Sequence, residues 1–569
     1  MSRARGWILG VLLVAALAVY WFETRPMGVE PGSVVVIQLQ GSYADAPANP
    51  LLARLTGGGE GSLTSLLGEL AKLERDERVD TVVFRIRSLA LGWGRVEEIR
   101  DAIRRLAEAG RKTVAYLEVE GFGNGSYVVA TGAQRVVAAP GHRNPFVGLA
   151  GEYLFLGGLF EKLGVEIEYE RIGRYKSAVE SYAAKEMSGP AREMQEALVD
   201  SIQERFLAIV AEGRGLETSA VEEAINQAPT GGQPMIQLGL IDEVQNWTEL
   251  MDGFEDQPIV KASDYAQVGF DALDFEPEAT FALVHGSGPV LIGKGQYASG
   301  GSPVMASDTV AEALREAAED PEVKAIIFRI NSPGGSALAS DIVWQAVQDV
   351  RKTGKPVIAS MSDVAASGGY YVAAGADKIV SHHTTYTGSI GVFVLRPVIG
   401  GLLEKLGVGV ETITRGPHAD LLLGSKPLSE ETRAVLRDDV EGVYELFLER
   451  VAEGRGLERD AVDAIAQGRV WTGAQALEIG LVDSLGGLRD AVIEGKRLVG
   501  LEDDAPVVLV QYPRPRPLAE ELMELFGGIQ SAVTPELPLP GTLASLVRLV
   551  RVLPVGAPLL VPPGLMEVH

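Results

Sequence analysis

Residues 83–88 read VFRIRS, and residues 327–332 read IFRINS. Two further strings recur in the same order, EKLGV at 161–165 and 404–408, and VAEGRGLE at 210–217 and 451–458. The offset between the copies stays between 241 and 244 residues, as expected when one ancestral unit has been duplicated. Repeats of this length are two similar domains and not a solenoid of short units.

Each copy alternates short apolar runs with amphipathic helical stretches, such as 96–108 and 340–352. The apolar runs that read as strands are 82–86, 114–117 and 136–139 in the first copy, and 325–330, 357–361 and 378–380 in the second. Near-continuous apolar strands separated by helices favour parallel βαβ units. The sequence therefore predicts an α/β fold twice over, with repeats spanning 33–250 and 279–500.

The composition agrees with a large two-domain enzyme and gives no sign of metal or disulfide chemistry. The chain has 569 residues, of which 46% are hydrophobic, and this is ample material for two cores. Its 51 basic and 77 acidic residues give a net charge of −26, which disfavours nucleic acid as a partner. Cysteine is absent, so disulfides, thiolate metal sites and a cysteine nucleophile are excluded. No metal-binding or nucleotide-binding motif is present, and we predict no metal and no cofactor.

The N-terminus predicts a membrane anchor. Arg3 and Arg5 lie in a short stub, residues 1–5, ahead of an uncharged apolar run at 6–22. A run of this length is at the lower end of what spans a bilayer, and the preceding basic residues favour a cytoplasmic N-terminus. A cleaved signal peptide is the alternative, because Ala16-Leu17-Ala18 resembles a cleavage site. The aromatic residues that end the run favour a retained anchor.

Residues 501–569 are assigned to neither repeat. A proline-rich linker begins with PRPRP at 513–517, and an apolar stretch, TLASLVRLVRVL, follows at 542–553. That stretch could lie on a membrane, pack on a partner subunit or pack on the protein's own body.

Ser367, within AASGGYY at 365–371, is the candidate nucleophile. It follows an apolar strand and precedes a helical run, so its hydroxyl would be exposed at a helix start, where the N–H of Gly368 can face an oxyanion. The glycines of NSPGGS at 331–336 follow a neighbouring strand, and Gly334 or Gly335 could supply the second N–H. Two such loops at the ends of parallel strands form the crevice where α/β proteins bind ligands.

Lys176, within GRYKSAVE at 173–180, is the candidate general base. A lysine amine can accept the serine proton if burial lowers its pKa from about 10.4. Aligning the repeats places Gly123 opposite Ser367 and Ala419 opposite Lys176, so each copy retains one half of a shared site. Lys162 and Lys405 occur in both copies and are interpreted as structural. Ser389, within TGSIGV at 387–392, could orient the lysine amine.

The strings AASGGYY, NSPGGS, TGSIGV and GRYKSAVE together resemble those of the long, two-repeat bacterial signal peptide peptidase A family, also called protease IV. The resemblance covers nearly all of residues 1–500 and implies a crotonase-like or Clp-protease-like fold in each repeat. It also implies a Ser/Lys dyad of Ser367 and Lys176. It further implies a tetramer, hydrophobic signal peptides as substrates, and a single-pass protein of the bacterial inner membrane with its catalytic domains on the periplasmic side.

Three alternatives remain open. Crotonase-like folds also hold thioester oxyanions, so an acyl-CoA enzyme is one. A membrane-anchored scaffold with an inactive site is the second. Within the peptidase interpretation, His382 or His383 could replace Lys176 as the base, in a Ser-His-Asp arrangement.

Overall fold

The computed structural model describes residues 29–46, 61–121, 123–273, 275–295 and 303–514, together with the backbone of 559–560. The predicted N-terminal anchor at 6–22 lies outside these residues. Within them, no helix is long and apolar enough to cross a membrane.

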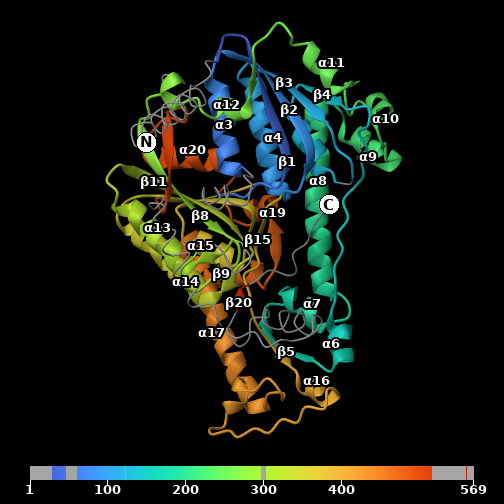
Figure 1. Cartoon of the computed structure of the whole chain (residues 1–569). Coiled ribbons are helices and arrows are strands. Elements are labelled where there is room, and N and C mark those ends of the chain that lie inside the picture. The colour runs from blue at the N-terminus through green and yellow to red at the C-terminus, as the bar shows by residue number, and fades with distance from the viewer. Residues whose placement is uncertain are drawn as a thin grey trace, which may run out of the picture.

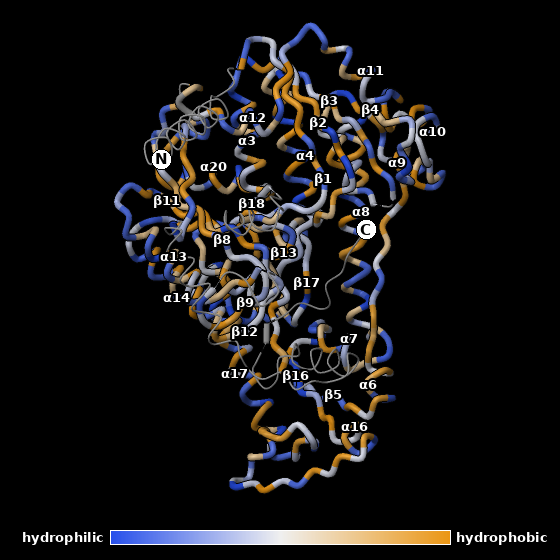
Figure 2. Tube along the Cα trace, viewed as in Figure 1, coloured by the Kyte–Doolittle hydropathy of each residue, from blue (hydrophilic) through white to orange (hydrophobic). Residues whose placement is uncertain are grey.

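The first repeat is built on a six-stranded parallel sheet, ordered β6-β4-β3-β2-β1-β7. Its strands are β1 (Ser33–Gly41), β2 (Val79–Leu89), β3 (Lys112–Leu117), β4 (Arg135–Ala138), β6 (Glu243–Val244) and β7 (Ile259–Lys261). Its helices are α3 (Leu63–Arg75), α4 (Trp93–Glu108), α5 (Gly125–Ala130), α6 (Gly157–Leu163), α7 (Glu180–Ala183), α8 (Gly189–Arg214), α9 (Thr218–Gln227), α10 (Gly232–Gln237), α11 (Trp247–Asp252) and α12 (Ala262–Tyr265). Figure 2 shows the hydrophobic residues concentrated along β1, β2 and β3.

The second repeat has the same plan. Its sheet contains the parallel strands β18-β14-β13-β11-β8-β19, and β15 and β17 extend it beside the end of β13. The strands are β8 (Ala279–Ser287), β11 (Val323–Ser332), β13 (Val357–Ala366), β14 (Lys378–Ser381), β15 (Tyr386–Gly388), β17 (Val470–Thr472), β18 (Ser484–Leu485) and β19 (Val507–Tyr512). The helices are α13 (Ser307–Glu319), α14 (Ala337–Lys352), α15 (Gly368–Ala374), α16 (Gly400–Lys405), α17 (Glu430–Arg455), α18 (Arg459–Ile465), α19 (Gly473–Glu478) and α20 (Leu488–Leu498). The predicted α/β fold and its two repeats are confirmed.

The second repeat extends past the predicted boundary at residue 500. Strand β19 pairs in parallel with β8, as β7 pairs with β1 in the first repeat. The short apolar run VVLVQY at 507–512 falls within residues 501–569, which the sequence assigns to neither repeat. Its place in the sheet comes from pairing with a strand more than 200 residues earlier, for which the local sequence carries no signal.

The recurring string VAEGRGLE ends the long helices α8 and α17, and it explains how these helices pack. A Cβ atom at Gly213 would lie 2.4 Å from the carbonyl oxygen of Thr131, and one at Gly454 would lie 1.8 Å from that of Ala374. Each glycine therefore allows its long helix to contact the end of the short helix, α5 or α15, that precedes it in the same repeat.

The two repeats are joined through a buried ionic cluster. Arg329, in the IFRINS strand β11, pairs with Asp45 after β1 and with Glu98 of α4, and its side chain is 1% exposed. The equivalent Arg85 of the first repeat pairs instead with Glu118 near the surface. In Figure 1 the first repeat lies above the second, with α4 directed toward the junction. Buried ion pairs of this kind are costly to break, so they hold the repeats in one relative position.

A third sheet combines both repeats, in the order β10-β9-β12-β20-β16-β5. Its strands are β9 (Val290–Leu291), β10 (Met305–Ala306), β12 (Gly335–Ser336), β16 (Val392–Val398), β5 (Glu166–Ile172) and β20 (Leu559–Leu560). Strand β5 of the first repeat pairs antiparallel with β16 of the second over seven residue pairs. The loop after β5 is thereby carried into the second repeat.

Candidate active site

Lys176 and Ser367 meet inside the second repeat, although 191 residues separate them in the chain. Lys176 follows β5, and Ser367 lies between the end of β13 and the start of α15. A hydrogen bond of 2.7 Å joins Lys176 Nζ to Ser367 Oγ, and neither side chain has exposed surface. The structure therefore brings together the two residues whose presence in only one repeat marked them in the sequence.

The amine of Lys176 is held by Ser389 as well. It donates to the backbone carbonyl of Ser389 at 2.9 Å and lies 3.0 Å from its hydroxyl oxygen. Among the described residues no carboxylate forms an ion pair with Lys176. Burial lowers the pKa of the Lys176 amine well below its usual value, because desolvation disfavours the charged form. An uncharged lysine with a free electron pair is what a general base requires.

Residues 467–469, which the sequence did not single out, hold Lys176 in position. The backbone N–H of Tyr175 donates to the carbonyl of Gln467 at 2.9 Å. A Cβ atom at Gly468, whose φ is +72°, would lie 2.6 Å from Lys176 Cβ. Only glycine fits this approach, so the chain at 467–469 packs directly against the lysine loop. The sequence carries a sign of this segment, a short insertion in the second repeat. The second repeat reads AIAQGRVWTG at 464–473, where the first repeat reads the shorter AINQAPTG at 224–231.

The backbone of Ser367 is in a sparsely populated conformation. Its φ is 56° and its ψ is −117°, values that cost a residue other than glycine on the order of 1–3 kcal/mol. The conformation is held by a 2.7 Å hydrogen bond from the Ser367 N–H to the carbonyl of Gly388. A serine fixed on a sharp strand-to-helix turn presents its oxygen at the end of the sheet, as nucleophile turns in α/β hydrolases do.

The glycines predicted for an oxyanion hole lie beside this turn but are not equivalent. The N–H of Gly334 already donates to Ser332 Oγ at 3.1 Å. The N–H of Gly368 has no acceptor among the residues that the structure describes. A Cβ atom at Gly368 would lie 3.1 Å from both Gly334 Cα and the backbone nitrogen of Gly335, so both glycines adjoin Gly368. The bond that the Gly334 N–H already makes is the reason to propose Gly335 as the second donor.

The alignment that placed Gly123 opposite Ser367 is shifted by one residue. Helix α5 begins at Gly125 and α15 begins at Gly368, which puts Asn124 in the position of Ser367. The tyrosines agree, since Tyr127 donates to the carbonyl of Leu240 as Tyr370 donates to that of Leu481. The slip arose because GFGNGS at 121–126 offers several glycines that can be aligned with AASGG. The correspondence around Lys176 holds, because the second repeat has no lysine between 416 and 425.

His382 and His383 lie at the junction of the repeats and not at Ser367. The nearest carboxylates are Glu98, 3.4 Å from His382 Nε2, and Glu97, 3.3 Å from His383 Nδ1. Burial alone lowers the pKa of His382, but the Glu98 carboxylate outweighs it and the pKa is raised. In the described part of the chain, neither histidine forms a hydrogen bond with Ser367. The geometry gives no support to a histidine base.

A slot for one extended strand passes Ser367. Strands β12 and β16 are both antiparallel to β20, which lies between them. Neighbouring strands are about 4.8 Å apart, so β12 and β16 are separated by two such spacings, about 9.6 Å. Gly335, which adjoins Gly368, is one of the two residues of β12. Any peptide in this slot would therefore pass beside Ser367.

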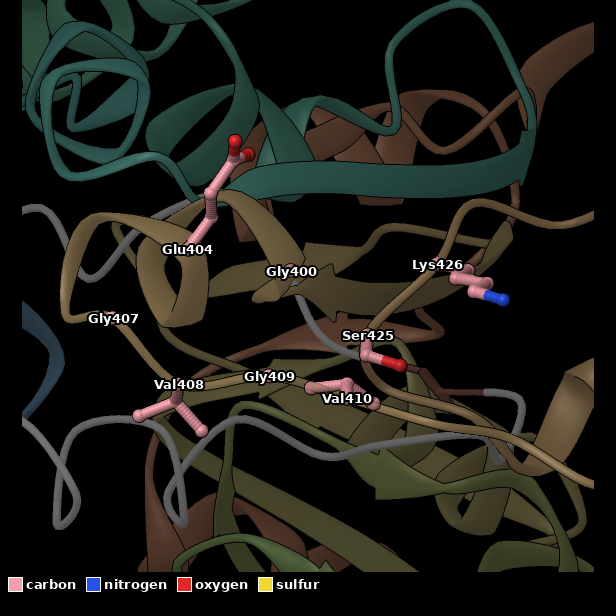
Figure 3. Close-up of a pocket in the computed structure, with 8 residues that line it drawn as sticks. All are labelled: Gly400, Glu404, Gly407, Val408, Gly409, Val410, Ser425 and Lys426. Carbon is pink, nitrogen blue, oxygen red and sulfur yellow. The ribbon is translucent and has the colours of Figure 1, made fainter.

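A separate cavity of about 480 Å³ lies beside α16. Figure 3 shows its lining residues, which come from α16, the segment that follows it and residues Ser425 and Lys426. The cavity contains neither Ser367 nor Lys176, and it offers no nucleophile paired with a base. The described residues also contain no cluster of histidine and carboxylate side chains suited to a metal ion.

A serine peptidase is the class of protein that this fold and this serine site define. The chain belongs to peptidase family S49, because the family model matches residues 105–261 and 349–502, more than half of the chain. It is 35% identical over 516 residues to a chloroplastic serine protease, SPPA, of Arabidopsis thaliana, covering 89% of this chain and 74% of that protein. It is also similar to Protease 4 of Haemophilus influenzae, with 32% identity over 72% of this chain and 68% of the relative. Protease 4 of Salmonella typhi is 29% identical over 79% of this chain and 75% of its own length.

Proposed function

We propose that this protein is a membrane-anchored serine endopeptidase that hydrolyses hydrophobic peptides through a Ser/Lys dyad. Ser367 is the nucleophile, Lys176 the general base, and the N–H groups of Gly368 and Gly335 form the oxyanion hole. The observation that carries this proposal is the 2.7 Å hydrogen bond between Lys176 Nζ and Ser367 Oγ in a site where both side chains are buried.

The mechanism uses only groups at this site. Neutral Lys176 takes the Ser367 proton as the oxygen attacks a peptide carbonyl carbon, and the two glycine N–H groups stabilise the oxyanion. The tetrahedral intermediate collapses, the C–N bond breaks, and protonated Lys176 gives its proton to the leaving amine. Lys176 then deprotonates a water molecule that attacks the acyl-enzyme, which releases the second product and restores Ser367. Ser389 holds the lysine amine in place through both proton transfers.

The slot between β12 and β16 supports an extended peptide as the substrate. Strand addition supplies main-chain hydrogen bonds of any sequence, and side-chain pockets then give the specificity. Exposed apolar side chains lie on the elements next to β12: Leu291 of β9, which is 44% exposed, and Leu338 at the start of α14, which is 61% exposed. We therefore propose apolar segments as substrates, and signal peptides left in the membrane after cleavage as the biological case.

The proposed location is the bacterial inner membrane, with a single anchor at 6–22 and the catalytic repeats on the periplasmic side. This rests on the apolar run and on the basic residues that precede it. A protease-protection experiment on inverted and right-side-out vesicles tests the orientation. Digestion of the repeats in inverted vesicles alone would contradict it.

A homo-oligomer is proposed because the pairing between the repeats is completed on one side only. Strand β5 of the first repeat pairs with β16 of the second, but the segments equivalent to their partners, 409–415 and 149–155, form no strands. Ile413 is 87% exposed and Leu154 is 72% exposed. Pairing of 149–155 with 409–415 of a second copy would repeat the observed junction and close a ring, for which we propose four subunits. Ile413→Asp should lower the oligomer mass measured by light scattering.

Hydrolysis of a fluorogenic apolar peptide by the purified protein tests the proposed function. The same protein is treated with a serine-directed phosphonate, and the labelled residue is located by mass spectrometry. Turnover together with a label on Ser367 supports the dyad. Turnover of an acyl-CoA thioester without peptide hydrolysis would favour the crotonase-like alternative, and neither turnover nor label would favour an inactive scaffold.

A further inference from the structure

A second cavity, of about 440 Å³, lies at the junction of the two repeats. Its lining comes mainly from α3 of the first repeat and from α20 and β19 of the second. Figure 1 shows α3 and α20 next to each other at this junction. Neither Ser367 nor Lys176 lines this junction cavity. Ligand sites usually have volumes of about 300–1,000 Å³, so there is room here for a small molecule that contacts both repeats.

The floor of the junction cavity is apolar. Leu67 of α3, Val492 of α20 and Leu509 of β19 line it. These three side chains pack on the buried core of the second repeat but keep part of their own surface exposed. Apolar surface that remains in contact with water is covered favourably by a hydrocarbon chain.

Gly68 leaves space on the α3 side of the cavity. It lies in the interior of α3, where glycine is less favourable than every residue except proline. A Cβ atom at Gly68 would meet no other part of the described structure within 4 Å, so close packing does not require a glycine here. The missing side chain widens the cavity at the expense of helix stability.

Basic side chains of both repeats converge on the cavity. Arg75 is the last residue of α3, and Arg489 and Lys496 belong to α20. Burial and the nearby Arg489 and Arg75 lower the pKa of the Lys496 amine, because burial disfavours its charge and the two arginines repel it. An anion bound among these side chains would relieve the repulsion.

Arg75 and Lys496 form no ion pair within the part of the chain that the structure describes. The Lys496 side chain is 9% exposed, and its amine donates to the backbone carbonyl of Asp503 at 2.8 Å. The Arg75 guanidinium lies 5.4 Å from the centre of the Phe275 ring and donates to the backbone carbonyl of Asp504 at 3.5 Å. Both cations are therefore available to an anionic group.

Most carboxylates that line the cavity are bonded to other groups. Five of the six are engaged in this way: Glu74 with Arg105 and Arg489, Glu98 with Arg329, Asp101 with Arg100, Asp490 with the Gly487 N–H, and Asp503 with Arg497. The sixth, Asp504, is exposed. The lining thus combines an apolar floor with cations that an anion can pair with.

We propose that the junction cavity binds a single-chain anionic amphiphile of the fatty-acid type, with its hydrocarbon chain on the apolar floor and its carboxylate between Arg75 and Lys496. The ligand contacts α3 and α20 together, so it stabilises the relative position of the repeats. The meeting of Lys176 with Ser367 depends on that position. Because the cavity contains neither residue, the proposal does not rest on the proposed peptidase function.

Binding of a fluorescent fatty acid tests the proposal. The full chain is held in phosphatidylcholine nanodiscs, and a dansyl-labelled undecanoic acid is added, with empty nanodiscs as the blank. We expect saturable binding that laurate displaces and dodecyltrimethylammonium does not, because only laurate carries an anionic head. Absence of saturable binding, or equal displacement by the two compounds, would overturn the proposal.

Charge variants test the position of the carboxylate. Lys496→Gln and Arg75→Gln should each weaken binding of the labelled acid by about 10-fold, because each removes a charge-assisted contact. Lys352→Gln is the matched control, since Lys352 is exposed on α14 and does not line the cavity. Equal losses in all three variants would attribute binding to overall charge and overturn the proposed site.

Substitutions at Gly68 test the position of the chain. Gly68→Phe should fill the space beside α3 and abolish binding, whereas Gly68→Ala adds one methyl group, favours the helix and should keep nearly full affinity. Laurate should raise the Tm of the wild type and of Gly68→Ala but not that of Gly68→Phe, because a ligand stabilises only a protein that binds it. An equal rise in all three proteins would place the ligand elsewhere and contradict the proposal.

Discussion

The turn before α5 and the turn before α15 are the same element with different chemistry. In the first repeat Asn124 has φ −81° and ψ −20°, an ordinary helical conformation, and its side-chain amide donates to the carbonyl of Val147 at 2.8 Å. In the second repeat Ser367 has φ 56° and ψ −117°, and its hydroxyl meets Lys176. The turn that holds Ser367 is strained, and its counterpart is relaxed. Strain is therefore retained only where it serves the proposed chemistry.

The position of Ser389 shows the same contrast. Its equivalent in the first repeat is Phe146, which has 1% exposure and packs between Tyr127 and Phe206, with ring centroids 5.2 and 5.5 Å away. A polar group that holds the lysine amine in one repeat is thus an aromatic core residue in the other. In the first repeat the Phe146 ring occupies this position with close hydrophobic packing, which stabilises the repeat and leaves no space for a lysine side chain.

Neither repeat can bring Lys176 and Ser367 together alone, because Lys176 follows β5 of the first repeat and reaches Ser367 through the pairing of β5 with β16 of the second. The two repeats must therefore keep a fixed relative position, and the buried cluster around Arg329 provides it. Substitutions at equivalent positions of the two repeats should have unequal effects on activity, and the following predictions use that inequality.

The largest effect is expected from Ser367→Ala compared with Asn124→Ala. Loss of the nucleophile should lower kcat/KM by about 10⁴-fold or more, as in other serine hydrolases. Asn124→Ala should keep nearly full activity and lose about 1–2 kcal/mol of stability, because the hydrogen bonds of its side-chain amide to the carbonyls of Val147 and Gly148 are removed. Peptide hydrolysis and chemical denaturation measure the two effects. Activity that survives in Ser367→Ala would disprove its role as nucleophile.

Lys176→Met compared with Lys162→Met is expected to give the next largest effect. Methionine has a similar length but no amine, so Ser367 would lose its base and kcat should fall by about 10³-fold. Lys162 is exposed and lies in the string EKLGV, which occurs in both repeats. Its substitution should therefore change kcat by less than about 2-fold. Near-normal turnover by Lys176→Met would require another base.

Ser389→Ala should have a smaller effect. The variant loses the hydroxyl that lies 3.0 Å from Lys176 Nζ but keeps the carbonyl bond at 2.9 Å. Loss of one hydrogen bond of about 1–1.5 kcal/mol predicts roughly a 10-fold decrease in kcat. Ser177→Ala is the matched control, since the Ser177 hydroxyl is buried next to Lys176 and has no hydrogen-bond partner among the described residues. Equal losses in both variants would indicate a general disturbance of the lysine loop.

The comparison of the repeats also separates the features that could be predicted from the sequence from those that could not. The strands, the two repeats and the candidates Ser367 and Lys176 follow from local patterns and from residues present in one copy only. The third sheet does not, because β12 and β20 are two-residue strands from distant parts of the chain, and such pairings leave no local signal. The hydrogen bond from the Gly334 N–H to Ser332 Oγ is likewise visible only in the folded backbone.

The pH dependence of kcat/KM should distinguish a lysine base from a histidine base. Burial lowers the pKa of Lys176 well below its usual value, but the amine must still lose its proton, so the rate should rise as pH increases through that pKa. The rising limb should persist in the double variant His382→Gln and His383→Gln, because neither histidine forms a hydrogen bond with Ser367 in the described structure. A limb that disappears in the double variant would disprove the lysine base.

The smallest expected effect is on stability. It tests the pKa of Lys176 without any measurement of catalysis. Burial lowers the pKa of Lys176 in the folded state, whereas the unfolded chain has a pKa of about 10.4, so between the two values the unfolded state binds one more proton. The free energy of unfolding should therefore rise with pH in this window, by up to about 1.4 kcal/mol per pH unit from this group. Lys176→Met should remove that slope and stabilise the protein more at neutral pH than at pH 10, and Lys162→Met should leave the slope intact. Denaturant titrations of the three proteins at several pH values measure the difference, and parallel pH profiles for wild type and Lys176→Met would show that Lys176 keeps an ordinary pKa after folding.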